Sequence, residues 1–219
     1  MSRLGRIVQM IKVLVADDHP VVREGLKQIL AEAQDIEVTA EAKDGYEILD
    51  KMRNQEFDVI VLDITMPGLM GLDVLKQLKS EKPELAVLIL SMHPEEQYAI
   101  RVLRAGASGY LTKASAPTKL TEAIRKLYGG GKYVSSSLAE RLADELGGDL
   151  TKLPHETLSD REYQVMCLIA SGKTVTQIAD QLALSVKTVS TYRSRILEKM
   201  RMKTNAELTH YAIEYQLVH

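Results

Sequence analysis

The first half of the chain alternates short apolar runs with segments of helical periodicity. Strand patterns occupy residues 11–16, 36–40, 57–62, 85–90 and 109–112. The first, third and fourth runs are almost continuously apolar, which is typical of strands buried on both faces of a parallel sheet. Helical patterns occupy residues 21–33, 46–53, 71–79, 95–105 and 118–127. These βα units predict an α/β domain with a five-stranded, doubly wound parallel sheet and helices on both faces.

The pattern changes after residue 128. Three consecutive glycines at 129–131 end the fifth helical pattern, and a short helix is expected at residues 137–146. Gly147 and Gly148, followed by Pro154, are typical of a linker. We therefore predict an α/β domain over residues 11–128 and a linker with one short helix over 129–156.

Only helical patterns are convincing in the remaining region, residues 157–219. Ser159 with Glu162, and Thr204 with Glu207, have the spacing of capping boxes in front of apolar-periodic helices. This region is expected to form a small all-α bundle.

Composition excludes several classes of protein. With 219 residues, 45% of them hydrophobic, the chain can build two ordinary cores. No apolar run approaches the roughly 20 residues that span a bilayer, and residues 1–10 lack the features of a secretion signal. We expect a soluble cytoplasmic protein without membrane contact. The single cysteine, Cys167, lies among apolar helix residues and is expected to be buried and unreactive.

The charge is unevenly distributed along the chain. The formal net charge is only −2, which by itself indicates no class of partner. Between residues 186 and 203, however, the basic residues are opposed only by Glu198. This concentration of positive charge indicates a surface that could meet nucleic acid.

Reactive side chains follow four of the predicted strands. Asp17 and Asp18 follow the first strand, Asp63 the third, Ser91 the fourth and Lys113 the fifth. In a parallel sheet these ends meet at one edge, where ligands bind. Carboxylates that lie so close together require a shared cation, and hard oxygen ligands favour Mg²⁺ or Mn²⁺. With the charge neutralised by metal and lysine, one carboxylate can attack phosphorus.

Each of these residues, taken alone, also fits a structural role. The aspartates can cap a helix or a loop, Ser91 can stand in a turn, and Lys113 can be a solvated charge. Their joint placement at strand ends is what the structural roles do not explain.

Four motifs resemble the receiver domain of two-component response regulators: residues 15–20 (Val-Ala-Asp-Asp-His-Pro), 62–68 (Leu-Asp-Ile-Thr-Met-Pro-Gly), 90–91 (Leu-Ser) and 109–113 (Gly-Tyr-Leu-Thr-Lys). The resemblance covers residues 11–127 and implies a flavodoxin-like receiver fold. It implies phosphorylation of Asp63 with the help of Lys113 and Ser91. Mg²⁺ would bind Asp18, Asp63 and the Thr65 backbone carbonyl, with Asp17 as an assisting or additional ligand.

The same resemblance implies that Ser91 and Tyr110 form the switch pair that responds to phosphorylation. One departure concerns position 114, where many receivers have proline and this chain has Ala114. The geometry of the Lys113–Ala114 peptide bond is therefore left open. Residues 1–9 precede the expected first strand and receive no functional assignment.

The basic region contains two helical patterns, at residues 174–182 and 186–200, joined by a short turn in which Ser185 can cap the second helix. Val189, Ile196 and Met200 form its apolar stripe. Short hydroxyl side chains on the polar face allow close approach to base edges, and the basic side chains can meet phosphates. The predicted DNA contacts are Lys187, Thr188, Ser190, Thr191, Arg193, Ser194, Arg195 and Lys199. An ordinary solvated amphipathic helix is the alternative.

Residues 158–162, 169–174, 177–179 and 187–192 resemble the LuxR-type helix-turn-helix domain. The whole chain is thus similar to response regulators of the NarL/FixJ family. In that family the last helix, here residues 205–215, often forms a dimer contact. Tyr211 and Tyr215, with Leu208 and Ala212, could supply that contact or could merely close the bundle.

The resemblance implies a DNA-binding response regulator. A histidine kinase would transfer phosphate to Asp63, and the phosphorylated protein would dimerise on double-stranded DNA and control transcription. Its only enzymatic chemistry would be its own phosphotransfer and dephosphorylation.

Two other functions compete with this interpretation. A metal-dependent phosphohydrolase could use the same carboxylate, but the DNA-reading region would then have no role, and no insertion for a substrate is visible. A constitutive DNA-binding dimer could use the receiver only for protein contact, but the complete set of Asp18, Asp63 and Lys113 argues against it.

Overall fold

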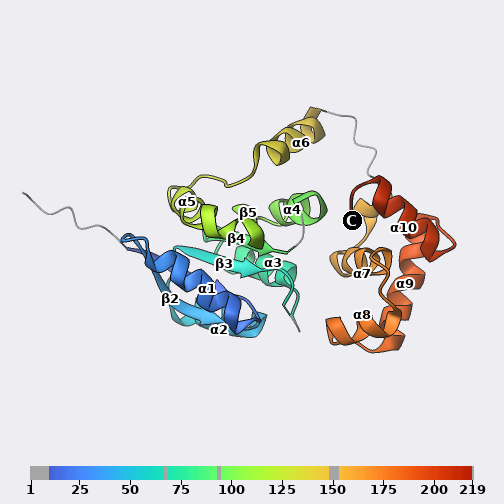
Figure 1. Cartoon of the computed structure of the whole chain (residues 1–219), viewed down its shortest axis with the longest axis horizontal. Coiled ribbons are helices and arrows are strands. Elements are labelled where there is room, and N and C mark those ends of the chain that lie inside the picture. Colours follow the sequence, from blue (N-terminus) through green and yellow to red (C-terminus); the bar gives the residue numbers. More distant parts are fainter. Residues whose placement is uncertain (1–9, 67–68, 93–94, 148–152, 219) are drawn as a thin grey trace, which may run out of the picture. The chain divides into compact units, whose positions relative to one another are not determined.

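The computed structural model describes residues 10–66, 69–92, 95–147 and 153–218. These residues form two compact units, which meet in sequence between Ser135 and Ser136. The first is the predicted α/β unit and the second is helical (Figure 1).

The α/β unit contains one sheet of five parallel strands in the order β2-β1-β3-β4-β5. The strands are β1 (Ile11–Ala16), β2 (Ile36–Ala42), β3 (Val59–Asp63), β4 (Ala86–Ser91) and β5 (Gly109–Thr112). From β1 the chain moves to β2 on one side and then crosses to β3 on the other, so the strand order reverses between β1 and β3. The doubly wound sheet is confirmed, and the crevice at this reversal is where such folds bind ligands.

Helices cover both faces of this sheet. They are α1 (Pro20–Ala31), α2 (Gly45–Asn54), α3 (Gly71–Glu81), α4 (Glu95–Arg104) and α5 (Ala116–Tyr128). Apolar side chains of α1 and α5 form one core with Val13, Val61 and Leu88. The alternate strand positions, such as Leu14 and Ile60, are also buried. Residues on both faces of the strands are therefore apolar, which explains the continuous runs in the sequence.

Local capping signals mark the ends of the helices in the α/β unit. Asp44 begins α2 by accepting a hydrogen bond from the N–H of Glu47. Gly106 follows α4 with φ +103°, a left-handed conformation that glycine adopts without strain. Pro94, expected in the first turn of α4, lies outside the described residues.

The chain after α5 returns to the edge of the sheet. The Tyr133 N–H donates to the Ser108 carbonyl at 3.0 Å, and the Tyr110 N–H donates to the Tyr133 carbonyl at 3.1 Å. A Cβ atom on Gly109 would lie 2.7 Å from the Tyr133 carbonyl oxygen, so this approach requires glycine. The region predicted as a linker thus begins with residues that belong to the α/β unit.

The helical unit contains α6 (Ser136–Gly147), α7 (Asp160–Ala170), α8 (Val175–Leu182), α9 (Val186–Met200) and α10 (Asn205–Glu214). Helix α7 contacts α8, α9 and α10, and its residues from Glu162 to Ala170 are all buried. Ser159 and Glu162 form the predicted capping box at the start of α7. Thr174 and Gln177 form another at α8, which the sequence reading missed although the spacing is the same.

Helix α10 contributes to the bundle core. Leu208 and Ala212 are fully buried, and Tyr211 is 8% exposed. The Tyr211 hydroxyl lies 2.9 Å from Nδ1 of His155, and burial raises the pKa of Tyr211 to about 12. Leu208, Tyr211 and Ala212 therefore help to close the bundle, whereas Tyr215 is 39% exposed. Ile213, 59% exposed, remains on the surface.

Across the described ranges, no helix is long and apolar enough to cross a membrane.

Candidate phosphoacceptor site and nucleic-acid interface

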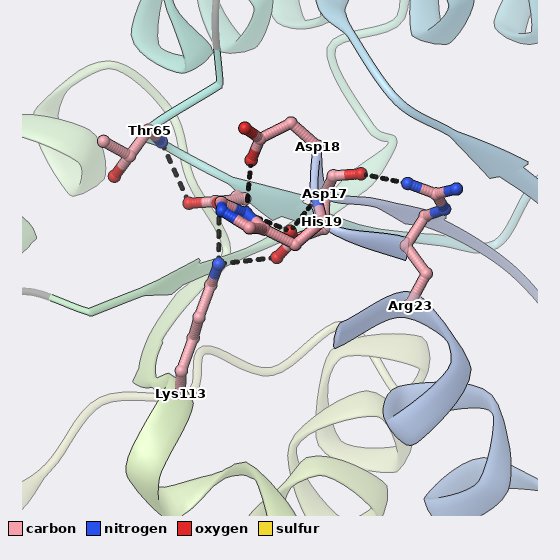
Figure 2. Close-up of polar contacts among 7 residues, drawn as sticks. Asp17, Asp18, His19, Arg23, Thr65 and Lys113 are labelled. Atoms are coloured by element: carbon pink, nitrogen blue, oxygen red, sulfur yellow. Dashed lines mark hydrogen bonds and ion pairs between the residues drawn. The ribbon is translucent and has the colours of Figure 1, made fainter. Parts of the chain in front are cut away.

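The carboxyl ends of three strands bring a lysine and two aspartates together. Asp17 directly follows β1, Asp63 ends β3, and Lys113 directly follows β5. The Lys113 Nζ atom lies 2.6 Å from Asp17 Oδ2 and 2.7 Å from Asp63 Oδ2 (Figure 2). Both carboxylates are buried, and the Lys113 side chain is 12% exposed. The structure therefore gathers these three predicted site residues where the strand order reverses.

Backbone amides orient the two buried carboxylates. The His19 N–H donates to Asp17 Oδ1 at 2.8 Å, and the Thr65 N–H donates to Asp63 Oδ1 at 2.9 Å. Asp18 is partly exposed, and its Oδ1 lies 2.8 Å from His19 Nδ1. Asp18 is thus the more accessible member of the acidic pair.

Burial and ion pairing act in opposite directions on this cluster. Burial raises the pKa of Asp63, although hydrogen bonds from Lys113 and from the Thr65 N–H oppose the rise. Burial also disfavours the charged form of Lys113, but its contacts with Asp17 and Asp63 outweigh this and raise its pKa. Lys113 therefore stays a cation, whereas ionisation of the buried Asp63 carboxylate costs free energy.

The acidic pocket fits a divalent cation. The formal negative charge of the three carboxylates, those of Asp17, Asp18 and Asp63, exceeds the positive charge of Lys113. Ligand atoms of Asp17, Asp18 and His19 all lie within 4.8 Å of one another. Asp17 Oδ2 contacts Lys113, Asp18 Oδ1 contacts His19, and the buried Thr65 Oγ1 has no hydrogen-bond partner among the described residues. Oxygen donors with excess negative charge are the ligands that Mg²⁺ prefers.

The predicted switch residues are both fully buried on neighbouring strands. Ser91 pairs with Thr112 and Ile89 pairs with Tyr110 in the register of β4 and β5. Because side chains alternate along a strand, Ser91 and Tyr110 lie on the same face of the sheet. Asp63 pairs with Leu90, so Ser91 stands one residue beyond the level of Asp63. The peptide bond after Lys113 is trans.

Helix α9 presents the polar face that the sequence predicts. Ser185 caps it by accepting from the Thr188 N–H, and Val189, Ile196 and Met200 are buried. The exposed residues of the predicted set are Lys187, Ser190, Thr191, Ser194, Arg195 and Lys199, with Thr188 and Arg193 partly buried. The Arg193 Nε donates to Asn205 Oδ1 at 2.7 Å.

Lys199 forms an ion pair with a buried carboxylate of its own domain. Its Nζ lies 2.6 Å from Oε2 of Glu162, whose side chain is 4% exposed. Burial alone would raise the pKa of Glu162, but hydrogen bonds from Lys199 and Ser159 outweigh it and lower that pKa. Lys199 therefore stabilises the buried carboxylate of Glu162. The sequence predicted Glu162 as part of a capping box but did not predict this ion pair.

Two family models match the chain. Residues 13–125 match the response regulator receiver domain, and residues 156–212 match the luxR family of bacterial regulatory proteins. This chain belongs to the NarL/FixJ family of response regulators. It is a DNA-binding response regulator in which a receiver domain precedes a LuxR-type domain, and it belongs to a class of transcription regulators.

Relatives of this response regulator match it over nearly its whole length. The response regulator UvrY of Escherichia coli strain K12 is 37% identical over 209 residues, which cover 95% of this chain and 96% of UvrY. The response regulator GacA of Pseudomonas syringae pv. syringae is 37% identical over 210 residues, covering 95% and 98%. A structure of the Salmonella typhimurium response regulator RcsB has a TM-score of 0.69 at 27% identity, covering 94% and 98%.

A further RcsB structure, from Salmonella enterica serovar Typhimurium, has a TM-score of 0.64 at 28% identity and covers 92% of this chain and 97% of that one. It contains RcsB bound to the promoter P1flhDC in the presence of the phosphomimetic BeF3-.

In this response regulator, replacing Lys199 with methionine is expected to lower the free energy of unfolding of the LuxR-type domain by about 1 kcal/mol at pH 7, since Lys199 is partly solvent-screened. The folded-state pKa of Glu162 is lowered. The contribution of ionised Glu162 to the stability of the domain is therefore present above the unfolded-state pKa of about 4.3. It is lost as pH falls through the folded-state pKa of Glu162. Hydrogen exchange of the α7 amides, compared at pH 7 and at a pH below the folded-state pKa of Glu162, measures this loss of stability.

Lys203→Met, at an exposed basic position of the same domain, serves as the control and should leave exchange nearly unchanged. Equal effects of the two substitutions would show that the contact with Glu162 does not stabilise the domain.

Proposed function

We propose that a histidine kinase phosphorylates this protein on Asp63 and that the aspartyl phosphate controls dimerisation and binding to double-stranded DNA. The observation that carries the proposal is the Lys113 Nζ atom, which lies within 2.7 Å of both Asp17 and Asp63 at the carboxyl ends of the strands. A lysine between two buried carboxylates is suited to a phosphoryl group that arrives on one of them.

The chain's own groups divide the work of phosphotransfer. A carboxylate oxygen of Asp63 attacks phosphorus, the new P–O bond forms, and the bond from phosphorus to the kinase histidine nitrogen breaks. Lys113 stabilises charge on the transferring oxygens, and the Ser91 hydroxyl donates to one of them. Asp17, Asp18, Asp63 and the Thr65 backbone carbonyl would hold Mg²⁺, which neutralises charge when bound. Phosphotransfer and dephosphorylation are the only reactions proposed.

The phosphoryl group would act through the switch pair. It adds negative charge beside Ser91 and alters the surroundings of Tyr110, which is buried on the same sheet face. The surface formed by α4 and β5 then changes, and two copies associate. Because these partners are a kinase and chromosomal DNA, the protein acts in the cytoplasm.

On DNA, α9 would enter the major groove. Its hydroxyl residues Thr188, Ser190, Thr191 and Ser194 can approach base edges, and Lys187, Arg193 and Arg195 can contact phosphates. Lys199 is proposed as a weaker phosphate contact because of its ion pair with Glu162. RcsB, which is similar to this chain over most of its length, has been solved as two dimers bound to two parallel DNAs. A dimer of this protein would likewise recognise paired half-sites.

The proposal is tested by incubating the protein with Mg²⁺ and acetyl phosphate and measuring its intact mass. The native protein is expected to gain one phosphoryl group, and Asp63→Asn none. Self-association and affinity for a DNA fragment selected by the protein should rise with phosphorylation. A phosphorylated Asp63→Asn variant, or unchanged DNA affinity of the phosphorylated native protein, would contradict the proposal.

A further inference from the structure

Arg23 lies beside the acidic pocket and contacts the loop that carries its aspartates. Its Nη1 atom donates to the Asp17 carbonyl oxygen at 2.7 Å, and its Nε atom donates to Glu41 Oε2 at 3.1 Å (Figure 2 shows the first contact). The Arg23 side chain is 16% exposed. One guanidinium thus joins α1, the loop after β1, and β2.

The Asp17 carbonyl has a particular influence on the pocket because it belongs to the peptide that links Asp17 to Asp18. The other polar groups of Asp17 are already held. Its N–H donates to the Ala42 carbonyl at 3.1 Å, and its carboxylate contacts His19 and Lys113. A planar peptide moves as one unit. Fixing the carbonyl therefore fixes the direction in which Asp18 leaves the strand.

Glu41 orients the guanidinium that makes this contact. It pairs with Val15 in the register of β1 and β2, and its Oε1 lies 2.8 Å from Lys27 Nζ. The hydrogen bond from Lys27 lowers the pKa of Glu41 despite partial burial, and Arg23 lowers it further. Glu41 is therefore a fixed anion. With Nε directed to it, the planar fork of Arg23 points Nη1 to the Asp17 carbonyl, which a lysine could not do for both acceptors.

We infer that Arg23, oriented by Glu41, is a positioning residue that sets the Mg²⁺ affinity of the pocket. It holds the Asp17–Asp18 peptide in the orientation in which both carboxylates can serve one ion. Arg23 contacts the Asp17 carbonyl and Glu41, and Glu41 contacts Arg23 and Lys27, so the proposed role acts through the Asp17–Asp18 peptide. The inference rests on the proposed function, because it concerns the ion that phosphorylation of Asp63 requires.

Mg²⁺ titration without any phosphodonor tests the inference directly. Calorimetry, or amide NMR shifts of Asp17 and Asp18, gives the dissociation constant. Arg23→Ala is expected to raise it about tenfold, as loss of a group that orients metal ligands generally does. Arg23→Lys, which can reach only one acceptor, should lie between, and Glu41→Gln should produce a smaller rise.

Arg125→Ala is the matched control. Arg125 makes two hydrogen bonds of 2.7 Å to Asp35, next to the start of β2 and at the opposite end of the sheet from the pocket. Its removal deletes a comparable ion pair but should leave Mg²⁺ affinity unchanged. If Arg23→Ala does not fold, Arg23→Lys and Glu41→Gln carry the comparison.

Phosphorylation by acetyl phosphate adds a second measurement. For Arg23→Ala the Mg²⁺ concentration at half-maximal rate should rise about tenfold, while the rate at saturating Mg²⁺ approaches the native value. General structural damage would lower the maximal rate instead. Native Mg²⁺ affinity in Arg23→Ala, or equal weakening in Arg125→Ala, overturns the inference. A native protein that binds Mg²⁺ but accepts no phosphate would overturn the proposed function alone.

Discussion

Asparagine at position 63 is expected to raise the free energy of unfolding of the receiver by about 1–3 kcal/mol at pH 7 without Mg²⁺, while it removes phosphorylation. The Asp63 side chain is 2% exposed, and burial raises its pKa. A buried carboxylate with a raised pKa destabilises the fold whenever it is ionised. Asparagine removes that charge, and Lys113 retains Asp17 as its counter-ion.

The pH dependence has a definite sign. Because the folded-state pKa of Asp63 is raised, its contribution to stability is fully present below the unfolded-state pKa of about 3.9 and is lost as pH rises through the folded-state value. The stability advantage of Asp63→Asn over the native receiver should therefore appear as pH rises through that value and disappear near pH 4. Urea unfolding between about pH 4 and pH 7, monitored by hydrogen exchange of receiver amides, measures this difference in stability.

Asp73→Asn, at an exposed position on α3, is the control and should show no comparable gain. Saturating Mg²⁺ should reduce or reverse the advantage, because the native pocket binds the ion more tightly. A variant that is less stable than the native receiver at every pH would show that ionised Asp63 costs the fold nothing.

DNA affinity is expected to fall about tenfold when Lys187 or Arg195 is replaced by methionine, measured near 0.1 M salt. Both side chains are exposed on α9, and within the described part of the chain neither forms an ion pair or hydrogen bond with another side chain. Each is free to neutralise a phosphate, so each substitution should reduce the slope of log affinity against log salt by about one. Fluorescence anisotropy with a DNA fragment selected by the protein gives both quantities.

Lys199→Met separates phosphate contact from general charge in the same assay. It removes one positive charge from the same helix, but that charge is paired with Glu162. Its effect on the salt slope should be clearly smaller than that of Lys187→Met. Equal slopes for the two variants would assign Lys199 to the phosphate contacts and contradict its role inside the domain.

Much of the receiver could be predicted because its signals are local. The bounds of β1 and β5 agree with the apolar runs, and strand β2 continues two residues further because Glu41 and Ala42 still pair with β1. Asp63 and Lys113 are distant in sequence, yet parallel strands bring their carboxyl ends together by topology alone. The sequence therefore predicted their proximity without any knowledge of side-chain packing.

The contacts that could not be predicted depend on tertiary packing or on backbone groups. Glu162 and Lys199 meet because α7 packs against α9, and no sequence period relates them. The contact of Arg23 with a main-chain carbonyl leaves no signature in residue types. Tyr133 returns to the sheet through backbone hydrogen bonds. The glycines at 129–131 instead suggested that a linker begins there.

The return of Tyr133 to β5 bears on how copies of this protein can associate. An open strand edge is a template onto which another chain can add, and native proteins protect such edges against aggregation. Here Tyr133 occupies the outer side of β5 at Gly109 and uses the backbone N–H of Tyr110. A second molecule could extend the sheet at this level only after displacing Tyr133. The chain thus protects its own β5 edge at Gly109 against the addition of a strand from another copy.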